Sequence, residues 1–131
     1  MILAQISDTH VCAKGMQLYG RIDTNAGLRR AVESINLLRP RPDAVLASGD
    51  LTESGAADEY AALRAILDRL EMPLYVMPGN HDSQDRLRAA FADHAYLPKD
   101  GFLHYTIKLG PVRLIALDTV VPGEDGGTLC A

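Results

Sequence analysis

Three short polar motifs contain the residue types that bind metal ions. They are Asp8-Thr9-His10, the pair Gly49-Asp50 and the run Gly79-Asn80-His81-Asp82. Their carboxylate, imidazole and amide groups offer oxygen and nitrogen ligands without thiolate, which favours Mn²⁺, Fe or Zn²⁺. One isolated motif of this kind is most often a turn, because Asp, Asn and Gly favour turns. Three such motifs in one short chain predict a metal site.

Each motif directly follows an apolar run that is typical of a buried strand. These runs are residues 1–7, 43–48 and 73–77, and we expect the first to be buried on both faces. Amphipathic patterns over residues 25–39, 57–70 and 85–91 predict helices, the first of them capped by Asp23 or Thr24. Alternating strands and helices predict an α/β fold with a parallel sheet, so the three motifs would meet at its carboxyl edge.

The spacing within the motifs suggests how they would share ions. Alternate side chains of an extended segment point the same way, so Asp8 and His10 could bind one ion together. Asp50 follows the neighbouring strand, where its two oxygens could bridge two cations. Asn80 could offer a neutral oxygen to the second cation.

The pattern changes after the third helix. Residues 102–109 and 112–118 are strand-like runs separated by Gly110-Pro111, which predicts an antiparallel hairpin and the start of a second sheet. No later element covers this hairpin. We therefore expect exposed apolar surface, which would favour self-association.

Composition excludes several classes of protein. The net charge of −4 argues against broad nucleic-acid binding, and neither a G-x-G-x-x-G nor a P-loop motif follows any strand. The first residues lack the basic region of a signal peptide, and no apolar run is long enough to span a membrane, so we expect a cytoplasmic protein. Cys12 and Cys130 lack metal-binding spacing and are expected to be reduced thiols.

The order D-x-H, G-D and G-N-H-D on this framework resembles the calcineurin-like metallophosphoesterases. Within that superfamily, LYGRIDT, LRPRPDAVLASGDLT and MPLYVMPGNHD are similar to bacterial class III cyclic-nucleotide phosphodiesterases and their glycerophosphodiesterase relatives. The resemblance implies a four-layer αββα sandwich. Residues 1–131 would then be the N-terminal part of a single domain: the first sheet with its helices and the start of the second sheet.

The resemblance also implies roles for individual residues. Two divalent metal ions are expected (Mn, Fe or Zn), with Asp8 and His10 binding the first, Asp50 bridging both and Asn80 binding the second. Asn80 and His81 would bind substrate, and His81 would be the catalytic residue that helps the leaving oxygen depart. Asp82 is expected to orient its loop.

The implied reaction is hydrolysis of a small phosphodiester by attack of metal-bound hydroxide. A 3',5'-cyclic nucleotide is the expected substrate, and a glycerophosphodiester or a broad range of phosphodiesters is the alternative. Tyr19, Arg21 and Asn25 follow the first strand, where they would either border the substrate pocket or brace their loop.

Family members carry further histidines in a later loop and in a G-H-x-H segment, and neither has a counterpart here. His94 and His104 stand in no such segment and are expected at the surface or in loops. The second metal ion would have only Asp50 and Asn80 as ligands in this chain, which predicts poor occupancy of the second site, little or no turnover and an incomplete chain. A non-catalytic interaction scaffold or an inactive fragment of the same fold is therefore the rival hypothesis.

Overall fold

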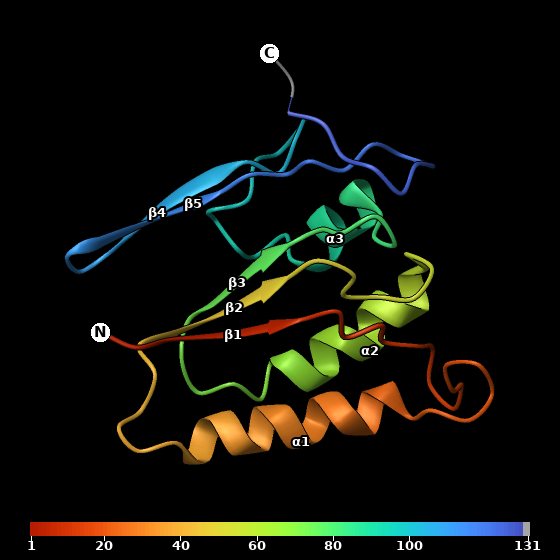
Figure 1. The fold of residues 1–131 in the computed structure, drawn as a ribbon, viewed down its shortest axis with the longest axis horizontal. Coiled ribbons are helices and arrows are strands. Elements are labelled where there is room, and N and C mark those ends of the chain that lie inside the picture. Colours follow the sequence, from red (N-terminus) through yellow and green to blue (C-terminus); the bar gives the residue numbers. More distant parts are fainter. Residues whose placement is uncertain (130–131) are drawn as a thin grey trace.

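The computed structural model describes residues 1–129, in which strands and helices alternate up to Ala90 and a hairpin follows (Figure 1). In chain order the elements are β1 (Leu3–Ser7), α1 (Thr24–Leu37), β2 (Ala44–Ser48), α2 (Ala57–Leu67), β3 (Leu74–Met77), α3 (Gln84–Ala90), β4 (Tyr105–Leu109) and β5 (Val112–Ala116). The predicted mixture of a parallel sheet, helices and a second sheet is confirmed.

The first sheet is parallel and has the strand order β1-β2-β3. β2 lies in the centre and pairs with both neighbours, from Leu3 opposite Ala44 to Ser7 opposite Ser48 along β1. Its first four residues are buried because strands flank both of its edges. In Figure 1, α1 and α2 lie below this sheet and the β4–β5 hairpin lies above it.

The prediction that the first strand is buried on both faces is wrong. β1 alternates exposed and half-buried residues, and Leu3 keeps 41% of its surface exposed. The strand pairs only with β2 among the described residues, and one of its faces is open to solvent. On that open face Gln5 donates a side-chain hydrogen bond to the hydroxyl of Ser48 at 2.8 Å.

The helices begin and end close to the predicted positions. Asp23 caps α1, because its carboxylate accepts the N–H of Ala26 at 2.8 Å. The apolar face of α1 is buried as its periodicity predicts. α2 ends at Leu67, before the predicted end at residue 70, although Leu70 still packs against the core.

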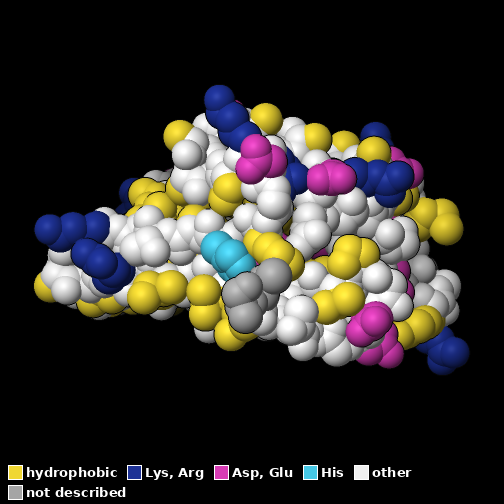
Figure 2. Space-filling model, turned by 90° about the horizontal axis from the view of Figure 1, so that it is seen from above, with side chains coloured by type: hydrophobic (Ala, Val, Ile, Leu, Met, Phe, Trp, Pro, Cys, Tyr) yellow, Lys and Arg dark blue, Asp and Glu magenta, His cyan; other side chains and the backbone are white. Residues whose placement is uncertain are grey.

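The predicted hairpin is confirmed. β4 and β5 pair in antiparallel fashion, with Leu109 opposite Val112 at the turn. The inward side of the hairpin contacts the first sheet, and the hydroxyl of Tyr105 donates a hydrogen bond to the carbonyl of Val76 in β3 at 3.0 Å. On the outward side Ile115 is 61% exposed and Leu117 is 48% exposed. Figure 2 views this side and shows apolar side chains in several patches.

The larger of two clusters of buried apolar residues within residues 1–129 connects the helices, the parallel sheet and the hairpin, and the smaller one joins Ile35, Val45 and Met72. The largest fully buried members of the larger cluster come from α2, α3 and the loops around them: Leu51, Tyr60, Leu63, Leu67, Leu87, Phe91 and Leu103. Within residues 1–129, no helix has both the length and the apolar character needed to cross a membrane.

Candidate metal centre

The loops after β1 and β2 continue to hydrogen-bond beyond the strands. The N–H of Asp8 donates to the carbonyl of Gly49 at 3.0 Å, and the N–H of His10 donates to the carbonyl of Asp50 at 2.9 Å. Gly49 in turn donates its N–H to the carbonyl of Met77 at the end of β3, at 3.1 Å. The residues that follow all three strands are therefore held together at the carboxyl edge of the sheet.

Three of the predicted metal ligands have a left-handed backbone conformation. The φ angle is +52° at Asp8, +40° at His10 and +48° at Asp50. The expectation that Asp8 and His10 lie in an extended segment is therefore wrong. Left-handed residues other than glycine cost about 1–3 kcal/mol each and cluster at functional sites, where the surrounding structure holds them. Backbone strain is thus concentrated at the residues whose side chains were predicted to bind metal.

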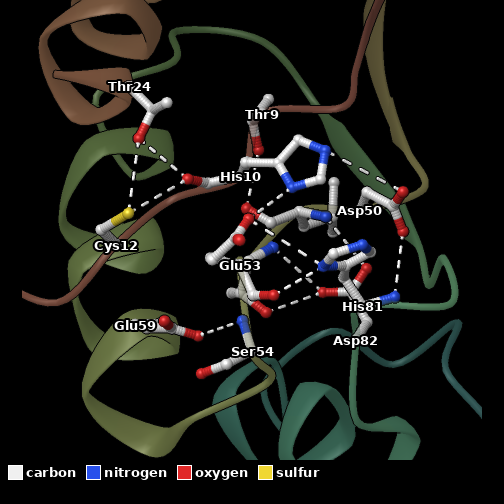
Figure 3. Close-up of polar contacts among 12 residues, drawn as sticks. Thr9, His10, Cys12, Thr24, Asp50, Glu53, Ser54, Glu59, His81 and Asp82 are labelled. Atoms are coloured by element: carbon white, nitrogen blue, oxygen red, sulfur yellow. Dashed lines mark hydrogen bonds and ion pairs between the residues drawn. The ribbon is translucent and has the colours of Figure 1, made fainter. Parts of the chain in front are cut away.

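Asp8, His10 and Asp50 form a group whose ligand atoms all lie within 4.8 Å of one another. Nε2 of His10 is 4.0 Å from Oδ2 of Asp50, and both side chains are largely but not fully buried (Figure 3). The carboxylates of Asp8 and Asp50 repel each other at this separation, and a cation between them would remove that repulsion. The side chains from β1 and β2 therefore come together as the motifs predict.

Gly79 allows the loop after β3 to approach Asp50. A Cβ at position 79 would lie 2.2 Å from both the main-chain nitrogen and Oδ1 of Asp50, which is closer than atoms can pack. In this close arrangement the N–H of His81 donates to Oδ1 of Asp50 at 3.1 Å. The G-N-H-D motif thus orients the Asp50 carboxylate through its backbone.

His81 lies against His10, with ring centroids 4.9 Å apart in an edge-to-face arrangement. Its Nδ1 lies 2.6 Å from the carbonyl oxygen of Glu53. Because a carbonyl has no proton to give, Nδ1 must be the donor. This hydrogen bond raises the pKa of His81 above its ordinary value; partial burial opposes the rise, and the negative charge of Asp50 adds to it. Asn80, the preceding residue, is exposed.

Glu53 belongs to the site, and the motif analysis missed it. Its Oε2 lies 2.8 Å from Nδ1 of His10 and 3.9 Å from Nδ1 of His81 (Figure 3). His10, Glu53 and His81 form a second group of potential ligands within 4.8 Å. The available signal was the position of Glu53 in the same loop as Asp50, three residues later in G-D-L-T-E.

Asp82 ties the loops after β2 and β3 together. Its carboxylate is buried and accepts the N–H groups of Leu51 at 2.9 Å, Thr52 at 3.1 Å and Gly79 at 2.8 Å. The hydroxyls of Thr52 and Tyr60 also donate to it, each at 3.0 Å. Burial, and then the charge of Asp82, raise the pKa of Tyr60, so its phenol stays protonated and donates. Asp82 thus orients its loop, as expected.

Tyr19, Arg21 and Asn25 were expected either to border the substrate pocket or to brace their loop. Asn25 braces its loop. Its buried amide accepts the N–H of Cys12 at 3.0 Å and donates to the carbonyl of Cys12 at 2.8 Å. Tyr19 is 76% exposed with a φ of +52°, and Arg21 is exposed as well. Cys12 is a free, buried thiol; Cys130 lies outside the described residues.

His94 and His104 stand apart from both groups of potential ligands in residues 1–129. They lie in loops and are half-buried rather than fully exposed. Nδ1 of His94 is 3.0 Å from the hydroxyl of Tyr96, and Nδ1 of His104 accepts the N–H of Asp118 at 2.9 Å. Both rings therefore have local structural contacts.

Comparison with known proteins places the chain in a family. Residues 1–129 match the family described as calcineurin-like phosphoesterase. The chain belongs to this family. It is 36% identical over 129 residues to a probable glycerophosphodiester phosphodiesterase of Arcobacter nitrofigilis, covering 98% of this chain and 47% of that protein.

Two further relatives have different named substrates. A glycerophosphodiester phosphodiesterase of Enterobacter lignolyticus is 39% identical over 133 residues, covering 98% of this chain and 47% of the relative. A cAMP/cGMP dual specificity phosphodiesterase of Mycobacterium tuberculosis is 34% identical over 134 residues, covering 99% of this chain and 42% of the relative. The chain of this calcineurin-like phosphoesterase thus spans about half the length of the curated relatives it matches.

Membership of the calcineurin-like phosphoesterases implies divalent metal ions, and the donor set of this chain fits them. Asp8, His10 and Asp50 supply carboxylate oxygen and imidazole nitrogen, and no thiolate stands among them. Mn²⁺, Fe and Zn²⁺ all accept such ligands. Asp50 also receives a hydrogen bond from the G-N-H-D loop, an outer contact of the kind that fixes metal-binding carboxylates.

Proposed function

We propose that this chain carries the metal-binding part of a phosphodiester hydrolase. The observation that carries the proposal is the convergence of Asp8, His10 and Asp50 within 4.8 Å at the carboxyl edge of the sheet. The left-handed backbone at the same three residues supports it, because strain of this kind persists where function requires it. The proposal concerns the ligands that this chain contains.

Asp8, His10 and Asp50 would hold the first metal ion, and Asp50 and Asn80 would hold the second. Without a cation, the two carboxylates would repel an anionic phosphate. When bound, divalent cations supply Lewis acidity, which offsets phosphate charge and lets water ionise near neutral pH. The second ion would have two protein ligands in this chain, so we expect it to bind more weakly than the first.

His81 would contribute as a proton donor and an electrostatic group. Its Nδ1 proton is held by the carbonyl of Glu53, so a proton on Nε2 is the one that can reach a leaving oxygen. In the metal-free chain the hydrogen bond to the Glu53 carbonyl raises the pKa of His81. The side chain is 38% exposed, which leaves it accessible to a small substrate.

The substrate class is a small phosphodiester, and two candidates follow from the relatives. Cyclic nucleotides are favoured by a relative named as a cAMP/cGMP dual specificity phosphodiesterase, at 34% identity. Glycerophosphodiesters are favoured by two relatives named for them, at 36% and 39% identity. Both substrates present the same reacting group to the metal site.

Hydrolysis of bis(4-nitrophenyl) phosphate in the presence of Mn²⁺ tests the reaction. We expect slow release of nitrophenol that Asp50→Asn abolishes and that the exposed control Asp85→Asn leaves unchanged. Parallel assays with 3',5'-cAMP and glycerophosphoethanolamine would distinguish the two substrate classes. Failure of the chain to bind Mn²⁺, or hydrolysis unaffected by Asp50→Asn, would contradict the proposal.

A non-catalytic interaction scaffold is the second candidate. The outward side of the hairpin favours it, because Ile115 and Leu117 are exposed there. Metal binding without hydrolysis of any of the three phosphodiesters, together with concentration-dependent association, would support this candidate instead.

A further inference from the structure

Glu53 contacts both histidines of the site with different groups. Its side-chain Oε2 lies 2.8 Å from Nδ1 of His10, and its main-chain carbonyl oxygen lies 2.6 Å from Nδ1 of His81 (Figure 3). The Glu53 side chain is 30% exposed and stands outside the Asp8, His10 and Asp50 group. One residue therefore faces the same ring atom of both histidines.

The contact with Glu53 determines which nitrogen of His10 can bind an ion. An ionised carboxylate only accepts hydrogen bonds, so Nδ1 of His10 must carry a proton. The lone pair of the neutral ring is then on Nε2, which faces Asp50 at 4.0 Å. The opposite tautomer would place a proton on Nε2 and block that nitrogen as a ligand. The hydrogen bond also fixes the orientation of the ring.

The same distances could describe a metal ion held by His10, Glu53 and His81, since their ligand atoms lie within 4.8 Å. Two observations argue against that arrangement. The carbonyl of Glu53 already engages Nδ1 of His81 at 2.6 Å, which makes this nitrogen a donor rather than a metal ligand. Nδ1 of His10 is likewise at hydrogen-bonding distance from an acceptor. A role in positioning His10 therefore fits the geometry better.

We propose that Glu53 is a positioning residue that holds His10 as the Nδ1–H tautomer, with Nε2 directed at the ion shared with Asp8 and Asp50. The inference rests on the proposed function, because it assumes that this group binds the ion. It adds a residue that the metal-binding motifs do not contain.

Two variants separate the hydrogen bond of Glu53 from its charge. Glu53→Ala removes the acceptor, whereas Glu53→Gln retains an acceptor oxygen and loses the charge. Glu33→Gln is the matched control, because it makes the same charge change at an exposed ion pair with Arg69 on the helical side. Mn²⁺ affinity is measured by electron paramagnetic resonance titration, and the His10 tautomer by side-chain ¹⁵N NMR of the metal-free full chain.

We expect Glu53→Ala to weaken Mn²⁺ binding about 10- to 100-fold, the usual effect of removing such an outer contact. In Glu53→Gln the loss should be smaller and the Nδ1–H tautomer should persist, and Glu33→Gln should match the unsubstituted protein. If Glu53→Ala fails to fold, the tautomer of the unsubstituted chain and the Glu53→Gln titration still decide the question.

An Nε2–H tautomer in the unsubstituted protein would overturn the inference. Unchanged Mn²⁺ affinity in folded Glu53→Ala, or no Mn²⁺ binding by the unsubstituted chain, would also overturn it. These readouts use the metal alone. Loss of phosphodiester hydrolysis with intact Mn²⁺ binding would therefore count against the proposed function and not against the role of Glu53.

Discussion

The loops after β1, β2 and β3 differ from the β4–β5 hairpin in how sequence determines structure. In the loops, left-handed residues and a buried carboxylate are held by hydrogen bonds between segments that are distant in the chain. The hairpin is regular backbone whose outward side exposes apolar residues such as Ile115. Substitutions should therefore cost far more in the loops than on the outward side of the hairpin.

The difference reflects how each region obtains its stability. Backbone pairing between the loops leaves some buried N–H groups without a backbone acceptor, and Asp82 supplies acceptors for those of Leu51, Thr52 and Gly79. The two strands of the hairpin hydrogen-bond to each other along the edge they share, and only the inward side of the hairpin packs against the core. The loop network keeps Asp50 and His81 in place, whereas the outward side of the hairpin remains free to change.

The largest expected effect is at Asp82. Asp82→Ala removes an acceptor from several buried donors, each of which costs about 1–3 kcal/mol when left unpaired. We expect a loss of at least about 3 kcal/mol in the free energy of unfolding, measured by urea denaturation. The control Asp85→Ala, at a side chain that is 95% exposed, should change stability by less than about 0.5 kcal/mol. Similar effects of the two substitutions would show that the network is not needed.

A smaller but site-specific effect is expected at Gly79. Gly79→Ala would force Asp50 away, because the added Cβ has no room beside the Asp50 backbone and Oδ1. We expect a loss of about 1–3 kcal/mol in unfolding free energy, together with weakened Mn²⁺ binding. Gly27→Ala is the opposite control: it lies within α1 with nothing inside 4 Å of the new Cβ, and it should stabilise by about 0.5–1 kcal/mol. If Gly79→Ala and Gly27→Ala have equal effects on unfolding free energy, the close approach of Gly79 to Asp50 does not require glycine.

On the outward side of the hairpin, Ile115→Lys should change the unfolding free energy by less than about 0.5 kcal/mol. If this surface drives self-association, the same substitution should lower the apparent mass of the chain in light scattering at high concentration. Leu103→Ala, at a fully buried neighbour of the hairpin, should cost about 2–5 kcal/mol. A large loss of unfolding free energy in Ile115→Lys would mean that the outward side of the hairpin makes contacts on which the fold depends.

The smallest expected effect is a pH dependence at His94. Burial lowers the pKa of His94, although the charge of Asp93 opposes the shift. As pH falls through the ordinary histidine value, about 6.5, the unfolded chain takes up this proton first, so the folded state loses stability. His94→Gln should flatten the stability curve between pH 7 and pH 5, relative to its own value at pH 8. If His94→Gln leaves the slope of unfolding free energy against pH unchanged, His94 is not the group responsible for this pH dependence.

The sequence was sufficient to predict the regular elements and the convergence of the motifs. Apolar runs and amphipathic periods carry that information locally, so the parallel sheet and the meeting of Asp8, His10 and Asp50 followed from them. The exposure of β1 was missed, although polar Gln5 and Ser7 stand on the same face as exposed Leu3, which is the alternation typical of a strand with one open face.

The finer geometry of the site depends on contacts between loops, which no local pattern contains. The left-handed φ at Asp8 and His10 is held by pairing with the Gly49–Asp50 segment. Glu53 was missed because its role depends on the orientation of the His10 ring, and a lone Glu in a loop resembles any solvated residue. The requirement for glycine at position 79 appears only when Asp50 is placed beside it.

The assignment of Asp8, His10 and Asp50 as metal ligands is tested most directly by comparing Mn²⁺ binding and metal-free stability in the unsubstituted chain and in Asp50→Asn. We expect the unsubstituted chain to bind Mn²⁺, close to one ion per chain at its tighter site. Asp50→Asn should lose that binding yet unfold at a higher urea concentration, because it removes charge repulsion and Asn tolerates a left-handed backbone. Equal Mn²⁺ affinity in the two proteins would contradict the assignment of Asp8, His10 and Asp50 as the metal centre.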